Sequence, residues 1–191
     1  MDWIRAIEIF ASVTGIAYVV LEILQKNAMW VLGILTGAAC AISFGTQQLW
    51  ASMGLNLYYV AMSVVGLIQW KKASAAVGEG EIHLCRLPEK VALWSALLFF
   101  VGGLVLVRLL EATGDAHPYL DGGATALSVV ATWWLAQSYL QQWLLWILAD
   151  LLTTTLCVIT GQYWMAGMYL AYTASAVYGY IHWKKYGKLI S

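Results

Sequence analysis

Asp150 is an acidic residue inside a long apolar run, and two tryptophans precede it in the segment WLLWILAD. Trp143, Trp146 and Asp150 are spaced i, i+3 and i+7, which places them on one face of one helix. Indole rings beside a carboxylate suit a flat aromatic cation, through stacking and cation–π attraction. The pattern predicts a binding site for such a cation. Two interpretations stay open beside it: Asp150 is a protonated or hydrogen-bonded structural residue, and Trp143 belongs to the tryptophan belt of a membrane interface.

The chain around these residues has the composition of a membrane protein. Of its 191 residues, 62% are hydrophobic and 10% are charged, whereas soluble domains carry roughly 25% charged residues. A helix that spans a bilayer needs about 20 mostly apolar residues. The sequence therefore predicts an all-α membrane protein. Its seven transmembrane helices are expected over 3–24, 28–45, 49–70, 90–110, 122–139, 143–160 and 163–183.

The basic residues predict how the chain is oriented, because cytoplasmic loops are enriched in Lys and Arg. Of the 10 basic residues, Arg5 and Arg108 fall on one predicted side of the membrane, and all the others fall on the opposite side. We therefore expect a multi-pass protein with its N-terminus outside and its C-terminus in the cytoplasm. The 10 acidic residues balance the 10 basic ones, so no nucleic-acid partner is expected.

The chain aligns with itself when it is shifted by 113 residues (143 − 30 = 113). The shift pairs Trp30 with Trp143, and the run Trp-Lys-Lys at 70–72 with the same run at 183–185. We predict two three-helix repeats of like orientation around a linker helix, a 3+1+3 parallel repeat of the kind found in some transporters. A duplication that serves stability alone is the alternative. The predicted divisions are 1–72 for the first repeat, 73–113 for the linker loop and fourth helix, and 114–191 for the second repeat.

Further polar side chains are expected to complete the site around Asp150. Substrate sites in parallel-repeat transporters lie near the midplane between the halves, and Tyr and Asn both donate and accept hydrogen bonds. Asn56 could instead hold two helices together. Gln47, Gln137 and Gln142 could form gates at the two mouths of the site, but we interpret them as solvated turn residues. The predicted substrate-binding residues besides the Trp-Trp-Asp set are Asn56, Tyr59, Tyr169 and Tyr172 at mid-span depth, Gln48 and Trp50 at the external mouth, and Gln141 at the cytoplasmic turn.

Motifs for other chemistries are missing from the sequence. It contains no Walker motif, no GxSxG and no HExxH, which are signatures of nucleotide-binding and hydrolytic proteins. His83, His117 and His182 are not spaced with cysteines or carboxylates as metal ligands would be. We therefore expect no enzymatic activity, no cofactor and no metal.

The duplicated 3+1+3 plan, WLLW followed by Asp150, and the span ends GLIQWKK and YGYIHWKK resemble the Pnu family of bacterial vitamin transporters. The resemblance extends over almost the whole chain. It implies a SWEET-like fold, a homotrimer in the bacterial inner membrane and one substrate site per protomer. It also implies facilitated diffusion of a small cationic vitamin, which a cytoplasmic vitamin kinase traps by phosphorylation.

The residue at position 150 bears on which vitamin this would be. Family members that carry nicotinamide riboside usually have Asn where this chain has Asp150, and another branch serves thiamine. A carboxylate can pair with the thiazolium charge or the aminopyrimidine of thiamine, so we expect thiamine slightly ahead of nicotinamide riboside. The alternative from another class is a proton-coupled transporter or channel that titrates Asp150. A membrane assembly protein without transport activity is a third.

Overall fold

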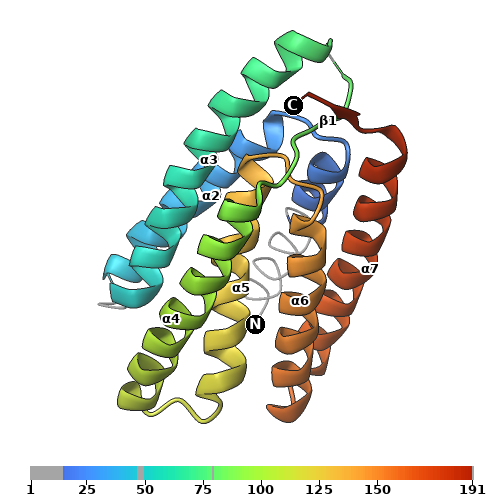
Figure 1. Ribbon diagram of the computed structural model, residues 1–191. Helices are drawn as coiled ribbons and strands as arrows, with labels where there is room; N and C mark the ends of the chain where they lie inside the picture. The colour runs from blue at the N-terminus through green and yellow to red at the C-terminus, as the bar shows by residue number, and fades with distance from the viewer. Residues whose placement is uncertain (1–14, 47–49, 79, 191) are drawn as a thin grey trace, which may run out of the picture. The chain divides into compact units, whose positions relative to one another are not determined.

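The structure is a computed structural model that describes residues 15–46, 50–78 and 80–190. It is helical apart from two short strands, which confirms the predicted all-α class (Figure 1). The described part of the first helix covers 15–23. The elements that follow are α2 (Ala28–Thr46), α3 (Trp50–Val77), β1 (His83–Leu84), α4 (Glu89–Thr113), α5 (Pro118–Ala136), α6 (Gln142–Ile159), α7 (Tyr163–Tyr186) and β2 (Lys188–Leu189).

Four of the described helices are long and apolar enough to cross a membrane: α2, α4, α6 and the Met53–Ala76 part of α3. Large apolar side chains on α4, such as Leu93, Trp94 and Phe100, are exposed on the protein surface. Soluble monomers rarely expose apolar patches of this extent. The chain is therefore a multi-pass membrane protein whose outer helix faces suit lipid.

The fifth helix begins and ends earlier than the predicted span 122–139. It starts at Pro118, which fits a first helical turn because the proline nitrogen needs no intrahelical partner there. It ends at Ala136, and Ser138 then takes a φ of 58°, which no α-helix accommodates. The third helix continues to Val77, seven residues beyond the predicted end at position 70 (77 − 70 = 7).

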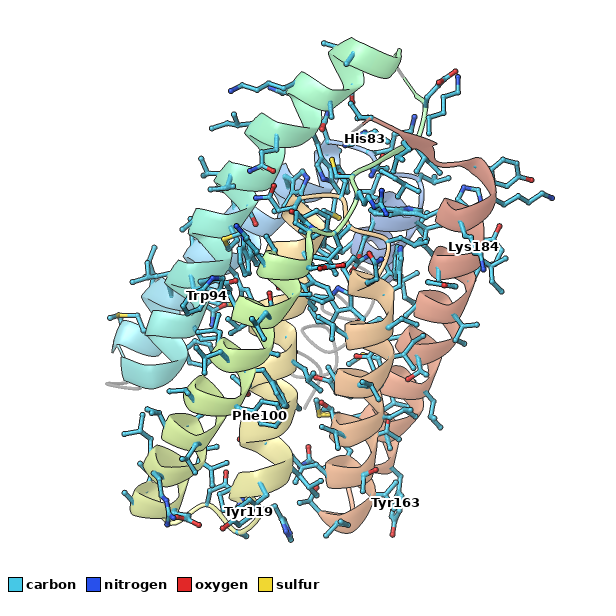
Figure 2. The ribbon with its side chains drawn as sticks, viewed as in Figure 1. His83, Trp94, Phe100, Tyr119, Tyr163 and Lys184 are labelled. Atoms are coloured by element: carbon cyan, nitrogen blue, oxygen red, sulfur yellow. The ribbon has the colours of Figure 1, made fainter. Side chains whose placement is uncertain are left out.

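The chain divides into two compact units. The N-terminal unit contains the described residues up to His83 and the segment Tyr186–Ile190, and the C-terminal unit contains Leu84–Lys185. In the N-terminal unit α2 packs along α3. In the C-terminal unit α5 packs against both α4 and α6 (Figure 1). Figure 2 shows Tyr119 and Tyr163 at one end of the C-terminal unit and Lys184 at the other.

A pair of buried tryptophans joins α2 to α3 in the N-terminal unit. The rings of Trp30 and Trp70 meet edge to face, with centroids 5.0 Å apart and planes at 78°. The ring of Trp30 lies directly against Gly66 of α3, where a Cβ atom would overlap it. The missing side chain of Gly66 thus creates the space that the indole fills.

The C-terminal unit contains the same arrangement at residue numbers 113 higher. The rings of Trp143 and Trp183 meet edge to face, with centroids 5.3 Å apart and planes at 87°. A Cβ atom at Gly179 would lie 2.5 Å from the Trp143 ring. The two units therefore use one packing motif, a tryptophan wedged between a second tryptophan and a helical glycine.

The turns before α2 and α6 also match. Gln25 and Ser138 have φ values of 50° and 58°, and they are the described non-glycine residues with positive φ. Their numbers differ by 113 (138 − 25 = 113). The Gln25 N–H donates to the Glu22 carbonyl at 3.0 Å, and the Ser138 N–H donates to the Leu135 carbonyl at 2.9 Å. Each turn thus reverses the chain through one left-handed residue.

The segment after α3 is held to the rest of the N-terminal unit by polar contacts that the sequence did not predict. The Gln25 side-chain amide forms two hydrogen bonds with the His83 backbone: it donates to the carbonyl at 3.0 Å and accepts from the N–H at 2.7 Å. The Lys188 N–H donates to the Ile82 carbonyl at 2.7 Å, and the Lys188 ammonium pairs with the Glu81 carboxylate. The C-terminal residues are thereby tied to this segment.

The His83 side chain is 1% exposed and meets the edge of Trp70, with centroids 5.7 Å apart. Its two ring nitrogens have no hydrogen-bond partner among the described residues. Burial lowers the pKa of His83 from 6.5 to about 4, because a charged imidazolium would lose its hydration there. His83 is therefore neutral in the folded protein at neutral pH.

Candidate functional site

Asp150 is 8% exposed and lies in the middle of α6. Within 15–46, 50–78 and 80–190, no Lys, Arg or His side chain forms an ion pair with it. The Thr154 hydroxyl, one turn further on, donates to the Asp150 backbone carbonyl at 2.7 Å. A buried carboxylate without a basic partner is costly and needs a cation or a proton. Asp150 is thus a buried carboxylate without a basic partner among the described residues, and its role in binding a cation stays a prediction.

Two tyrosines of α7 lie near this carboxylate. Tyr169 and Tyr172 are both partly buried, and their rings meet edge to face with centroids 5.9 Å apart. Both phenols lie within electrostatic range of Asp150. Each phenol can donate or accept a hydrogen bond. The structure therefore brings together Asp150, Tyr169 and Tyr172 within the C-terminal unit.

The two predicted tryptophans of α6 differ in their surroundings. Trp143 is 1% exposed, enclosed by Trp183 and Gly179 as described above. Trp146 lies one turn before Asp150, is partly buried, and has an indole N–H without a partner among the described residues. The packing of Trp143 is structural, as for its counterpart in the N-terminal unit. Trp146 is less enclosed than Trp143, and a direct contact of either indole with a ligand stays a prediction.

The N-terminal unit has glycines where α6 carries Trp146 and Asp150. Gly33 and Gly37 occupy the positions 113 residues earlier. A Cβ atom at Gly37 would lie 2.9 Å from a methyl group of Val60 on α3. The α2–α3 pair is thus closely packed at the level where the C-terminal unit presents an indole and a carboxylate. The indole and the carboxylate of α6 therefore have no counterpart at the equivalent positions of α2.

Other predicted residues are placed as follows. Asn56 and Tyr59 lie on α3 of the N-terminal unit, both partly buried. Gln141 directly precedes α6 and is exposed. Gln48 lies outside the described residues, as does the side chain of Trp50. Roles for these residues in binding stay predictions.

Gln142 was interpreted as a solvated turn residue, and this was wrong: its side chain is 0% exposed. Neither its amide oxygen nor its amide nitrogen has a hydrogen-bond partner among the described residues. Gln142 corresponds to Met29 in the 113-residue shift, and Met29 is equally buried. The apolar residue at the equivalent position was a signal in the sequence that position 142 would be enclosed.

No metal centre is formed within the described ranges, where no three His, Cys, Asp or Glu side chains gather. What remains is a buried carboxylate with aromatic and phenolic neighbours in an apolar helical unit. Apolar helices around an internal polar site are typical of membrane transporters.

Comparison with known proteins agrees with this class. Residues 5–185 match the family described as Nicotinamide mononucleotide transporter, and the chain belongs to that family. It is 32% identical over 96% of its length to the nicotinamide riboside transporter PnuC of Neisseria mucosa, covering 73% of that protein. It is 26% identical to the PnuC protein of Escherichia coli, over 96% of this chain and 85% of that protein.

A solved structure is also similar. The crystal structure described as the vitamin B3 transporter PnuC matches with a TM-score of 0.68 and 31% identity, covering 92% of this chain and 79% of that one. The predicted membership of the Pnu family of vitamin transporters is confirmed, and these relatives are transporters rather than enzymes. Their names refer to nicotinamide riboside, so they favour this substrate and do not support the expected preference for thiamine.

Proposed function

We propose that this chain takes up nicotinamide riboside by facilitated diffusion, and that phosphorylation by a cytoplasmic vitamin kinase traps the substrate. The family membership and the names of the relatives support the substrate. The observation that carries the proposal is the buried carboxylate of Asp150, which has no basic partner among the described residues and lies near Tyr169 and Tyr172.

The chemistry of the site fits a ribosylated pyridinium. Its positive charge offsets the charge of Asp150, which would otherwise remain unpaired in a buried position. Its flat ring can stack on Trp146, the indole one turn away. Its ribose hydroxyls can bond with the phenols of Tyr169 and Tyr172. One ligand would thus interact favourably with all four side chains, those of Trp146, Asp150, Tyr169 and Tyr172.

We further propose seven transmembrane helices in a SWEET-like 3+1+3 parallel repeat. The Trp-Trp-Gly packing and the left-handed turn residues, each found twice at a spacing of 113 residues, support the duplication. The distribution of basic residues supports an N-terminus outside and a C-terminus in the cytoplasm. The resemblance to the Pnu family suggests a homotrimer in the inner membrane.

Calorimetric titration of the purified full-length chain with nicotinamide riboside, thiamine and riboflavin tests the substrate. We expect nicotinamide riboside to bind most tightly. Thiamine is the second candidate, because Asp150 stands where the resemblance implies an amide. Tighter binding of thiamine than of nicotinamide riboside would replace the proposed substrate while keeping the class of transporter.

The side chain of Asp150 has its own test. Asp150→Ala should weaken nicotinamide riboside binding by more than tenfold, or about 1.4 kcal/mol, because the desolvated charge pair is lost. Gln162→Ala, in the exposed turn after α6, serves as the control. An unchanged dissociation constant for Asp150→Ala would remove that side chain from the site.

Uptake into vesicles that contain only this protein separates passive from proton-coupled transport. Under facilitated diffusion, the initial rate of nicotinamide riboside uptake should be the same with and without a pH gradient. A rate that follows the gradient would establish the alternative, in which Asp150 carries a proton.

A further inference from the structure

Gln142 has an unusual environment for a glutamine. It is the first residue of α6, its side chain is fully buried, and both polar atoms of its amide lack a partner among the described residues. Leaving a buried donor or acceptor unsatisfied destabilises a folded protein. An apolar residue would fit without this cost, as Met29 does at the equivalent position of the N-terminal unit. The buried amide therefore destabilises the ligand-free protein, and a ligand that forms hydrogen bonds with it would remove this destabilisation.

The register of α6 connects this amide with the site already described. Gln142, Trp146 and Asp150 follow one another at intervals of four residues, on one side of the helix. At 1.5 Å per residue, each interval is about 6 Å along the helix axis. An amide, an indole and a carboxylate are thus arranged in a row, and the Trp146 indole N–H also lacks a partner among the described residues.

We propose that Gln142 binds the carboxamide group of the substrate. This inference rests on the proposed function. A primary carboxamide offers one acceptor oxygen and a donor nitrogen, which match the donor and acceptor of a glutamine side chain in a paired arrangement. With the carboxamide at Gln142, the pyridinium ring falls beside Trp146 and the ribose falls toward Asp150.

This assignment makes Gln142 a specificity-determining residue. A riboside whose ring carries a carboxylate instead of a carboxamide has only acceptors to offer, so one half of the pairing becomes repulsive. Sites built to hydrogen-bond a substrate group discriminate strongly against analogues that lack it. Because Gln142 is fully buried, this assignment requires the surrounding side chains to move when the substrate binds.

The test compares two ligands on two forms of the full-length protein. The ligands are nicotinamide riboside and N-ribosylpyridinium, which has the same charge and ribose but no carboxamide. The variant is Gln142→Met, which has nearly the volume of glutamine and reproduces the residue of the N-terminal unit. An aminopyrimidine edge presents the same donor and acceptor pair as a carboxamide, so thiamine is not used here. Gln162→Met, at an exposed turn, is the control.

By calorimetry, Gln142→Met should bind nicotinamide riboside at least tenfold more weakly than the unaltered chain, while N-ribosylpyridinium changes by less than threefold. The apparent melting temperature of the ligand-free variant should be equal or higher, because an unsatisfied amide has been removed. A role of Gln142 in folding alone would instead lower it.

Two results overturn the inference and are distinguishable. If the unaltered chain binds both ribosides and the variant weakens both alike or neither, Gln142 does not bind the carboxamide, and the proposed function stands. If the unaltered chain binds neither riboside, the proposed function fails and the inference fails with it.

Discussion

Gly179 should be one of the least replaceable positions of α7. A Cβ atom there would lie 2.5–2.7 Å from ring atoms of Trp143, well inside van der Waals contact. The ring cannot move away easily, because Trp143 is 1% exposed and its ring also contacts Trp183, one turn further along α7. Gly179→Ala therefore forces a shift of the ring or of the helix.

The loss of stability expected for Gly179→Ala is the balance of two opposing effects. Overpacking of an enclosed site costs about 1–3 kcal/mol, whereas alanine is favoured over glycine in a helix interior by about 0.5–1 kcal/mol. The chain supplies a matched control on the same helix, since a Cβ atom at Gly167 would meet nothing within 4 Å. Both Gly179→Ala and Gly167→Ala gain the helix preference of alanine. The difference between their effects on stability therefore measures the cost of overpacking at Gly179 alone.

The assay is thermal unfolding of the purified protein in detergent, followed by tryptophan fluorescence. We expect Gly179→Ala to melt several degrees below the unaltered chain and Gly167→Ala to melt at the same temperature or slightly above. The N-terminal unit offers a replicate, with Gly66→Ala against Trp30 and Gly54→Ala in open space. Equal melting temperatures for Gly179→Ala and Gly167→Ala would refute the packing argument.

Two further predictions concern the segment after α3. Gln25→Gly should lower the melting temperature despite relieving a positive φ, because the His83 N–H and carbonyl lose both amide contacts; Ser138→Gly, which relieves the same backbone conformation, should not lower it. The folded pKa of His83 is about 4, below its ordinary value of 6.5, so its stabilising effect is complete above pH 6.5 and is lost as the pH falls toward 4. Melting curves across this range should show a weaker pH dependence in His83→Phe than in the unaltered chain, and identical slopes would contradict the assignment of His83 as a buried neutral group.

Several features could be predicted from the sequence because they depend on local composition and spacing. Apolar runs fix which segments become helices, so the existence of α2 to α7 followed from the sequence, with shifts at the ends of α3 and α5. Asp150 stood out because an acidic residue in an apolar run is costly wherever the helix lies. The 113-residue shift identified Trp30 and Trp143 as equivalent before any contact was known.

Only the tertiary structure decided which side of each helix is enclosed. Spacing placed Trp143 and Trp146 on one face, but the absence of a side chain at Gly179 lets the Trp143 ring pack fully buried against α7, whereas Trp146 is only partly buried. Gln142 looked like an ordinary turn residue, because polarity predicts solvation and burial depends on residues distant in the sequence. The two hydrogen bonds between the Gln25 side chain and the His83 backbone join residues 58 apart in the sequence, and no local pattern encodes such a contact.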